Sequence, residues 1–176
     1  FSGGSAFNTT AAYLCKRNVK IGYIIPTTDN GGSSSEILRF FGGPSVGDFR
    51  NRLLRLARQD TAEACAVRAL FEHRLGTNTS RAQQEWTQII NGNHSLWTKA
   101  ITPCFRTTLM RFLQFFDDSV QSQQVRFPSL GPFVWCSGSV GNFFFTGARL
   151  FFKSLDAAIF WWSRVAQIPE YARVIP

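Results

Sequence analysis

The chain has 176 residues, of which 44% are hydrophobic and 17% are charged, a balance that is typical of a globular protein and excludes a disordered one. Its net charge of +8 indicates either an anionic partner or a partial chain whose charges need not balance. No apolar run approaches the ~20 residues of a membrane helix, and neither a signal peptide nor a nucleic-acid-binding module is recognisable. We therefore expect a cytoplasmic protein that binds neither membranes nor nucleic acid.

The start of the chain predicts a strand-helix-strand unit. Phe1–Phe7 is typical of a strand end and a glycine turn, Asn8–Lys16 of a short helix, and Val19–Ile25 of a second strand that Pro26 ends. The strands of such a unit are parallel. The predicted fold class is therefore α/β: a Rossmann-like three-layer fold with a mainly parallel sheet and a helical insertion. Because Phe1 and Arg173–Pro176 both resemble parts of strands, we expect a partial domain, incomplete at both ends.

Capping residues and apolar periodicity then predict three helices. Serines cap the first helix, an aspartate caps the second, and an aspartate or a threonine caps the third. The predicted elements are Glu36–Phe41 after Ser33, Ser34 or Ser35, a helix opening at Gly47-Asp48 with Asp48 as its N-cap, and Thr61–Leu75 after Asp60 or Thr61. Arg52, Arg55 and Arg58 recur every three residues and form either a solvated face or an electropositive wall beside a phosphate site.

The character of the sequence changes after Leu75. Gly76–Pro132 is rich in Asn, Thr, Gln and Ser and predicts a helical insertion, in which Arg106–Ser122 is the strongest helix. The chain then returns to the sheet with a short buried strand, an apolar helix, a second helix and a final strand. These elements are Phe133–Cys136, the helix that starts at Asn142, Leu155–Ala166 and Val174–Ile175. The predicted parts of the domain are residues 1–75, 76–132 and 133–176.

Three glycine-rich turns each join a strand to a helix start. Glycine allows the backbone to approach a ligand closely, and helix N-termini favour phosphates. In a parallel sheet these turns meet at one edge, where ligands bind, so we expect a phosphate or nucleotide site there. None of them matches the phosphate loop that ends in Gly-Lys-Ser/Thr or the dinucleotide fingerprint. The predicted binding residues are Gly3, Gly4, Ser5, Asn30, Gly31, Gly32, Ser33, Ser34, Ser139, Gly141 and Asn142.

Two aspartates beside these turns, Asp29 and Asp48, are the candidate catalytic residues. Mg²⁺ often uses one or two carboxylates together with substrate oxygens, and Asp29 is the candidate Mg²⁺ ligand. The alternatives are an Asx turn for Asp29 and a helix cap for Asp48. Arg50 and Asn51 lie in the first turn of the same helix, where they can reach a phosphate or a base. No serine-histidine-acid or cysteine-histidine arrangement can be assembled, so covalent hydrolysis is not expected.

The cysteines do not suggest a disulfide framework. Cys15, Cys65, Cys104 and Cys136 are far apart and lie mostly in apolar settings, which predicts reduced, buried thiols. Because the chain has only two histidines, His73 and His94, a histidine-cysteine metal cage is not expected either.

At these motifs the chain resembles the family of 2-phospho-L-lactate transferase (CofD) and the bacterial gluconeogenesis factors. The resemblance covers Phe1 to about Leu75 and Val134 to Pro176 and is weakest across Gly76–Pro132. The helical insertion and the sequence as a whole are similar to those of eukaryotic, particularly fungal, members of the family. Ala6 replaces a glycine of the family. The matching blocks, in the family's order and spacing, are Gly3-Gly4-Ser5-Ala6, Asp29-Asn30-Gly31-Gly32-Ser33-Ser34, Gly47-Asp48-Phe49-Arg50-Asn51 and Ser139-Val140-Gly141-Asn142-Phe143.

The resemblance implies a ligand site over the strand ends of a Rossmann-like fold. In the transferase, an acceptor phosphate attacks a nucleoside diphosphate diester or a related activated phospho-acid, a nucleotide leaves, and Mg²⁺ assists. We therefore expect a transferase of a phospho-containing group, with a nucleotide or nucleotide-activated phospho-substrate of the GDP/GTP or UDP-sugar type as its partner. The alternative is a non-catalytic nucleotide-sugar-binding regulator, as in the gluconeogenesis factors. A homodimer is left open by the aromatic runs Phe143–Phe145 and Trp161–Trp162.

Overall fold

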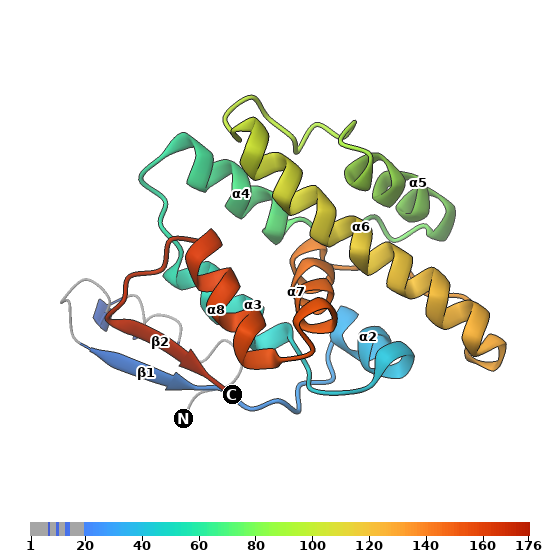
Figure 1. Ribbon diagram of the computed structural model, residues 1–176, viewed down its shortest axis with the longest axis horizontal. Helices are drawn as coiled ribbons and strands as arrows, with labels where there is room; N and C mark the ends of the chain where they lie inside the picture. The colour runs from blue at the N-terminus through green and yellow to red at the C-terminus, as the bar shows by residue number, and fades with distance from the viewer. Residues whose placement is uncertain (1–6, 8–9, 11–12, 15–19) are drawn as a thin grey trace.

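The computed structural model describes residues 7, 10, 13, 14 and 20–176. Figure 1 shows a largely helical molecule with two strands side by side along one side. The expected turn at Gly3, Gly4 and Ser5, and most of the expected helix Asn8–Lys16, lie outside the described residues. The elements that follow are β1 (Ile21–Ile24), α2 (Ser33–Phe41), α3 (Gly47–Leu56), α4 (Ala62–Glu72), α5 (Thr79–Ile90), α6 (Pro103–Arg126), the short 3₁₀ helix η1 (Pro128–Leu130), α7 (Val140–Phe152), α8 (Leu155–Val165) and β2 (Ala172–Ile175).

The sheet of the described residues has two strands. β1 and β2 pair in parallel, with Ile21 opposite Ala172 and Ile24 opposite Ile175. The parallel pairing agrees with the expected α/β character, but the described residues do not form the expected three layers. Figure 1 shows α3 and α8 lying next to the strands, and both helices contact β2.

The strand expected at Phe133–Cys136 is wrong. The segment is irregular and joins no strand ladder among the described residues. Phe133 and Trp135 are buried whereas Val134 is exposed, so the alternation typical of a strand is present without a neighbouring strand. Here the alternation arises because the segment lies along the helical core, where alternate side chains face inward.

The helices lie where the sequence predicts them, but some of the predicted N-cap residues are wrong. Thr61 Oγ1 caps α4, accepting a hydrogen bond from Ala64 N–H. Asp48 is not a cap, because α3 begins at Gly47 with Val46 as its N-cap. The serine cap of α2 is also wrong, since the helix already begins at Ser33 and its N-cap is Gly32, whose φ of 53° is readily adopted only by glycine.

The core is an aromatic cluster built around α7. Residues 140–148 of this helix are all buried, as its apolar sequence predicts. Phe116 of α6 stacks on Phe143 with ring centroids 4.9 Å apart, and Trp86 of α5 stacks on Trp135 at 5.0 Å. The helices of the 76–132 segment therefore share one core with α7, and Figure 1 shows α6 crossing over it.

Several surface expectations need correction. Cys65 and Cys104 are exposed and Cys136 is partly buried; all three are free thiols, but none is fully buried, because apolar neighbours in sequence do not fix the side that faces the core. The arginine series does not form one face, since Arg52 is buried against the ring of Tyr23 while Arg58 is exposed and pairs with Asp60. Among the described residues, no helix is both long and apolar enough to cross a bilayer.

Candidate functional site

Buried polar side chains join the first turns of α2, α3 and α7. Arg50 donates from Nε to Asn142 Oδ1 at 3.1 Å and from Nη2 to Ser139 Oγ at 2.8 Å. Asn142 in turn donates from Nδ2 to Ser33 Oγ at 2.9 Å. We call Ser33, Arg50, Ser139 and Asn142 the polar junction; all four are buried. The fold thus brings together residues that are up to 109 positions apart and that the sequence assigned to one site.

Ser139 has two roles in the polar junction. As the N-cap of α7, its Oγ accepts a long hydrogen bond of 3.4 Å from Asn142 N–H, and the same oxygen accepts the bond from Arg50. A serine hydroxyl has two acceptor lone pairs, so both bonds can form at once. The cap therefore fixes the start of α7 and the position of the Arg50 guanidinium together.

Arg50 is a buried cation. Burial, reinforced by the nearby charge of Arg74 and opposed by that of Glu72, lowers the pKa of Arg50 to about 10, so it remains charged at neutral pH. Its hydrogen-bond acceptors among the described residues are a hydroxyl and an amide oxygen rather than a carboxylate. A charge held in this way is not neutralised by its partners, and it favours an anion nearby.

Asp29 follows β1 and lies against the first turn of α3. Its Oδ1 accepts a hydrogen bond from Gly31 N–H at 3.1 Å, which is the Asx-turn alternative. A Cβ added to Gly47 would overlap Asp29 Oδ2 and Ser34 Oγ, so glycine at this position permits the close approach. Because Oδ2 has no hydrogen bond among the described residues, one carboxylate oxygen remains for a metal ion or a substrate.

Three other expected site residues are not part of the polar junction. Asp48 is partly buried in the first turn of α3, whereas Asn30 and Asn51 are exposed. Asn51 follows Arg50 on a helix, where successive side chains point about 100° apart, and this rotation directs it away from the junction.

A cavity of about 320 Å³ opens beside the N-terminus of α2, and its lining includes Gly32, Ser33 and Ser137. Glu36 also lines it, but its carboxylate is bound to Arg39 and to the backbone N–H of Val134. The remaining polar lining therefore consists of hydroxyl and backbone groups, which suit a phosphate.

Arg74 is a residue that the sequence did not identify. It donates from Nη1 to Ser137 O at 3.3 Å, and the same nitrogen would lie 3.9 Å from a Cβ added at Gly32. Ser137 and Gly32 both line the cavity, so Arg74 lies at its edge. Arg74 and Ser139 form an isolated antiparallel bridge, which places the end of α4 beside the start of α7. No local signal predicts a bridge between segments so far apart in the chain.

Comparison with known proteins identifies the family. The family described as 2-phospho-L-lactate transferase CofD matches residues 1–176. The chain belongs to the CofD family. It is also 37% identical over 182 residues to YNL011C, an uncharacterized protein of Saccharomyces cerevisiae. This alignment covers 99% of the chain but only 38% of the yeast protein. No solved structure matches the chain.

The family match extends across the insertion, where the sequence motifs are weakest. Within this CofD-family chain, Gly141 has a packing requirement of its own. A Cβ there would overlap the backbone oxygen of Phe71, the next-to-last residue of α4. Glycine at 141 is therefore explained by close packing of α7 on α4, whereas Gly32 lines the cavity itself.

Proposed function

We propose that this chain forms the phosphate-binding part of a transferase that moves a phospho-containing group from or onto a nucleotide-activated substrate. Membership of the CofD family supports a transferase-like function. The observation that carries the proposal is the polar junction, in which a buried, charged Arg50 is linked through Asn142 to Ser33, a residue that lines the open cavity at the N-terminus of α2. In the full-length protein we expect the parallel sheet to continue into a three-layer Rossmann-like fold.

The site residues would act by positioning and by neutralising charge, which is how most phosphoryl-group chemistry is catalysed. Ser33 and the N–H of Gly32, which both line the cavity, would bind phosphate oxygens. Arg74 would contact the anion directly, and Arg50 would stabilise it from behind. Asp29 fits a Mg²⁺ ligand, because its Oδ2 has no hydrogen bond within the described part of the chain and Mg²⁺ needs only one or two carboxylates when substrate oxygens complete the shell. Bound Mg²⁺ would offset the negative charge of the phosphates.

The test is calorimetric binding of GDP, GTP, UDP and a UDP-sugar to the full-length protein with and without Mg²⁺. We expect one nucleotide class to bind with a Kd in the micromolar range, about −8 kcal/mol. Arg50→Lys should weaken binding in both conditions, since the single ammonium nitrogen of lysine cannot reproduce the planar guanidinium, which bonds Asn142 and Ser139 from two different nitrogens. Asp29→Ala should weaken only the Mg²⁺-dependent component.

Asp156→Ala is the matched control, because Asp156 is an exposed aspartate at the start of α8, outside the polar junction. Binding that is equally strong in Asp29→Ala, Arg50→Lys and Asp156→Ala would show that the nucleotide site lies elsewhere.

A non-catalytic nucleotide-sugar-binding regulator is the second candidate. The observation that favours it is the absence of histidine from the polar junction: both histidines of the chain lie at another cluster, around Glu85. The two candidates differ in turnover. Release of free nucleotide from the bound substrate in the presence of an acceptor phosphate would exclude the regulator, whereas binding without release under those conditions would favour it.

A further inference from the structure

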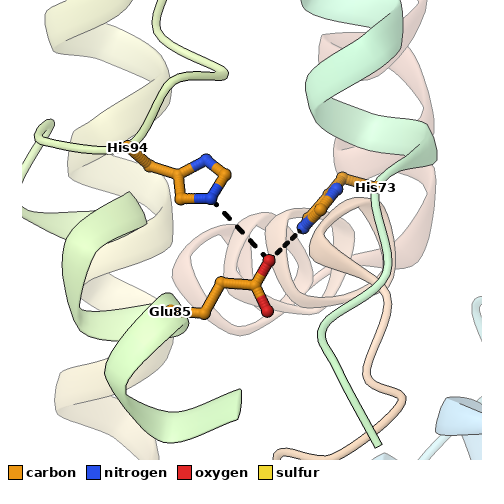
Figure 2. Close-up of side chains that lie close together, drawn as sticks. All are labelled: His73, Glu85 and His94. Atoms are coloured by element: carbon orange, nitrogen blue, oxygen red, sulfur yellow. Dashed lines mark hydrogen bonds and ion pairs between the residues drawn. The ribbon is translucent and has the colours of Figure 1, made fainter. Parts of the chain in front are cut away.

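The two histidines of the chain come together around one carboxylate. His73 follows α4, Glu85 lies on α5, and His94 lies in the loop between α5 and α6. Figure 2 shows both imidazole rings pointing toward the Glu85 carboxylate from opposite sides. His73 Nε2 lies 2.6 Å and His94 Nε2 lies 3.7 Å from the same atom, Glu85 Oε1.

We propose that His73, Glu85 and His94 bind a divalent transition-metal ion, with Zn²⁺ the expected ion. Each residue offers one ligand atom, and these atoms lie within 4.8 Å of one another. In a tetrahedral zinc site with metal–ligand bonds near 2.0–2.1 Å, neighbouring ligand atoms are about 3.3 Å apart. Small side-chain rotations therefore suffice to enclose an ion. Two imidazoles and one carboxylate are a ligand set that suits zinc and excludes Mg²⁺, which prefers oxygen ligands.

The surroundings already orient the three ligands. Gly76 N–H donates to Glu85 Oε2 at 3.0 Å, leaving Oε1 directed at the histidines. Supporting bonds of this kind orient metal ligands in proteins. Leu96 N–H donates to His94 Nδ1 at a long 3.3 Å. Metal binding at Nε2 requires the imidazole proton to be on Nδ1. Nδ1 then no longer accepts the hydrogen bond from Leu96 N–H, which is weak at that length.

The three ligand side chains are partly exposed, at 26%, 24% and 17% of their surface. Three protein ligands with access to solvent leave a fourth position for water or another small ligand, unlike a closed four-ligand structural site. The ion would join the end of α4, the middle of α5 and the following loop. His73 O also accepts a hydrogen bond from Val140 N–H at 3.1 Å, so the metal site would be tied to the start of α7.

The test uses full-length protein purified without an affinity tag that binds metals. Metal content is measured directly, and Co²⁺ is then titrated into chelator-treated protein, since its visible absorption reports the coordination geometry. We expect one equivalent of Co²⁺ to bind with a tetrahedral spectrum and to be displaced by Zn²⁺ but not by excess Mg²⁺. Loss of a metal ligand should weaken binding by about 100-fold or more, because loss of a supporting residue alone costs 10–100-fold.

The variants are His94→Gln and Glu85→Gln, with Glu170→Gln as the matched control on the exposed loop before β2. Each variant is melted without metal to establish that it folds. Zn²⁺ should raise the melting temperature of the wild type and the control but not of the two ligand variants. No stoichiometric Co²⁺ binding in the wild type, or equal binding in all variants, would overturn the metal site. Neither result bears on nucleotide binding at the polar junction.

Discussion

At the scale of single residues, Asp117 combines a necessary hydrogen bond with a costly charge. Its Oδ1 accepts a bond of 2.8 Å from Trp86 Nε1, a buried indole in the aromatic core. Burial raises the pKa of Asp117, the bond from Trp86 opposes this effect, and the neighbouring charge of Asp118 raises the pKa further. The core therefore needs an acceptor at this position but gains nothing from its negative charge.

We predict that Asp117→Asn is stabilising at pH 7, because the amide oxygen keeps the indole bonded and the charge is removed. A carboxyl whose folded pKa is raised contributes stability below its unfolded pKa and loses it as the pH rises through the folded pKa. The advantage of Asp117→Asn should therefore shrink as the pH falls from 7 to 4. Melting temperatures of both proteins across this range provide the measurement.

Asp117→Leu is the comparison variant, because it fills similar space without an acceptor. It should lower the free energy of unfolding by about 1–3 kcal/mol, the cost of leaving a buried donor unpaired. Equal destabilisation by Asn and by Leu would show that the charge itself is needed.

At the scale of elements, local sequence patterns predicted where the helices lie. Contacts between segments far apart in the chain determine which of their side chains meet at the candidate site. The Ser-Val-Gly-Asn turn predicted the start of α7, and the Gly-Asp-Phe-Arg block predicted that of α3. Arg50 and Asn142 were both expected near a phosphate, but their direct contact was not predicted, and the strand expected before α7 is absent from the described residues. Arg74 and the Glu85 cluster could not be found this way, since their partners come from segments without a shared periodicity.

The glycines at helix starts give an ordered set of predictions. In Gly141→Ala the new Cβ meets the backbone oxygen of Phe71, which cannot rotate away, so we expect a loss of about 1–3 kcal/mol. In Gly47→Ala it meets side-chain atoms of Asp29 and Ser34, which can move, so stability should fall less. Urea denaturation of each variant measures the difference.

Gly76→Ala is the control for this series, because the nearest atom to its added Cβ is a side-chain oxygen of Glu85 at 3.9 Å. It should change stability little. A ranking in which Gly76→Ala costs as much as Gly141→Ala would contradict the packing explanation.

At the scale of the whole molecule, the 76–132 segment does not behave as an appended unit. Phe116 of α6 packs against Phe41, Phe133 and Phe143, which lie on either side of that segment in the sequence. An insertion expected from composition alone thus supplies part of the common core. Composition marks a change in surface character, whereas membership of a core depends on which side chains face inward.

We predict that Phe116→Ala lowers the free energy of unfolding by about 3–5 kcal/mol, as for other buried phenylalanines. Fluorescence and circular dichroism should still report one coincident transition, because both parts share the core. Val125→Ala, on an exposed position of α6, is the control and should change little. Two separate transitions, with α6 melting first, would indicate that the segment folds independently.

The pairing of β1 with β2 has a consequence for the order in which the protein forms. Ile21 lies opposite Ala172, so closing this small sheet joins residues about 150 positions apart. Contacts of such long range are entropically expensive and form slowly unless the intervening chain is already compact. We therefore expect the helices between the strands to assemble before the sheet closes. During synthesis β1 leaves the ribosome before β2, and the two strands cannot pair until almost all of these 176 residues have been released.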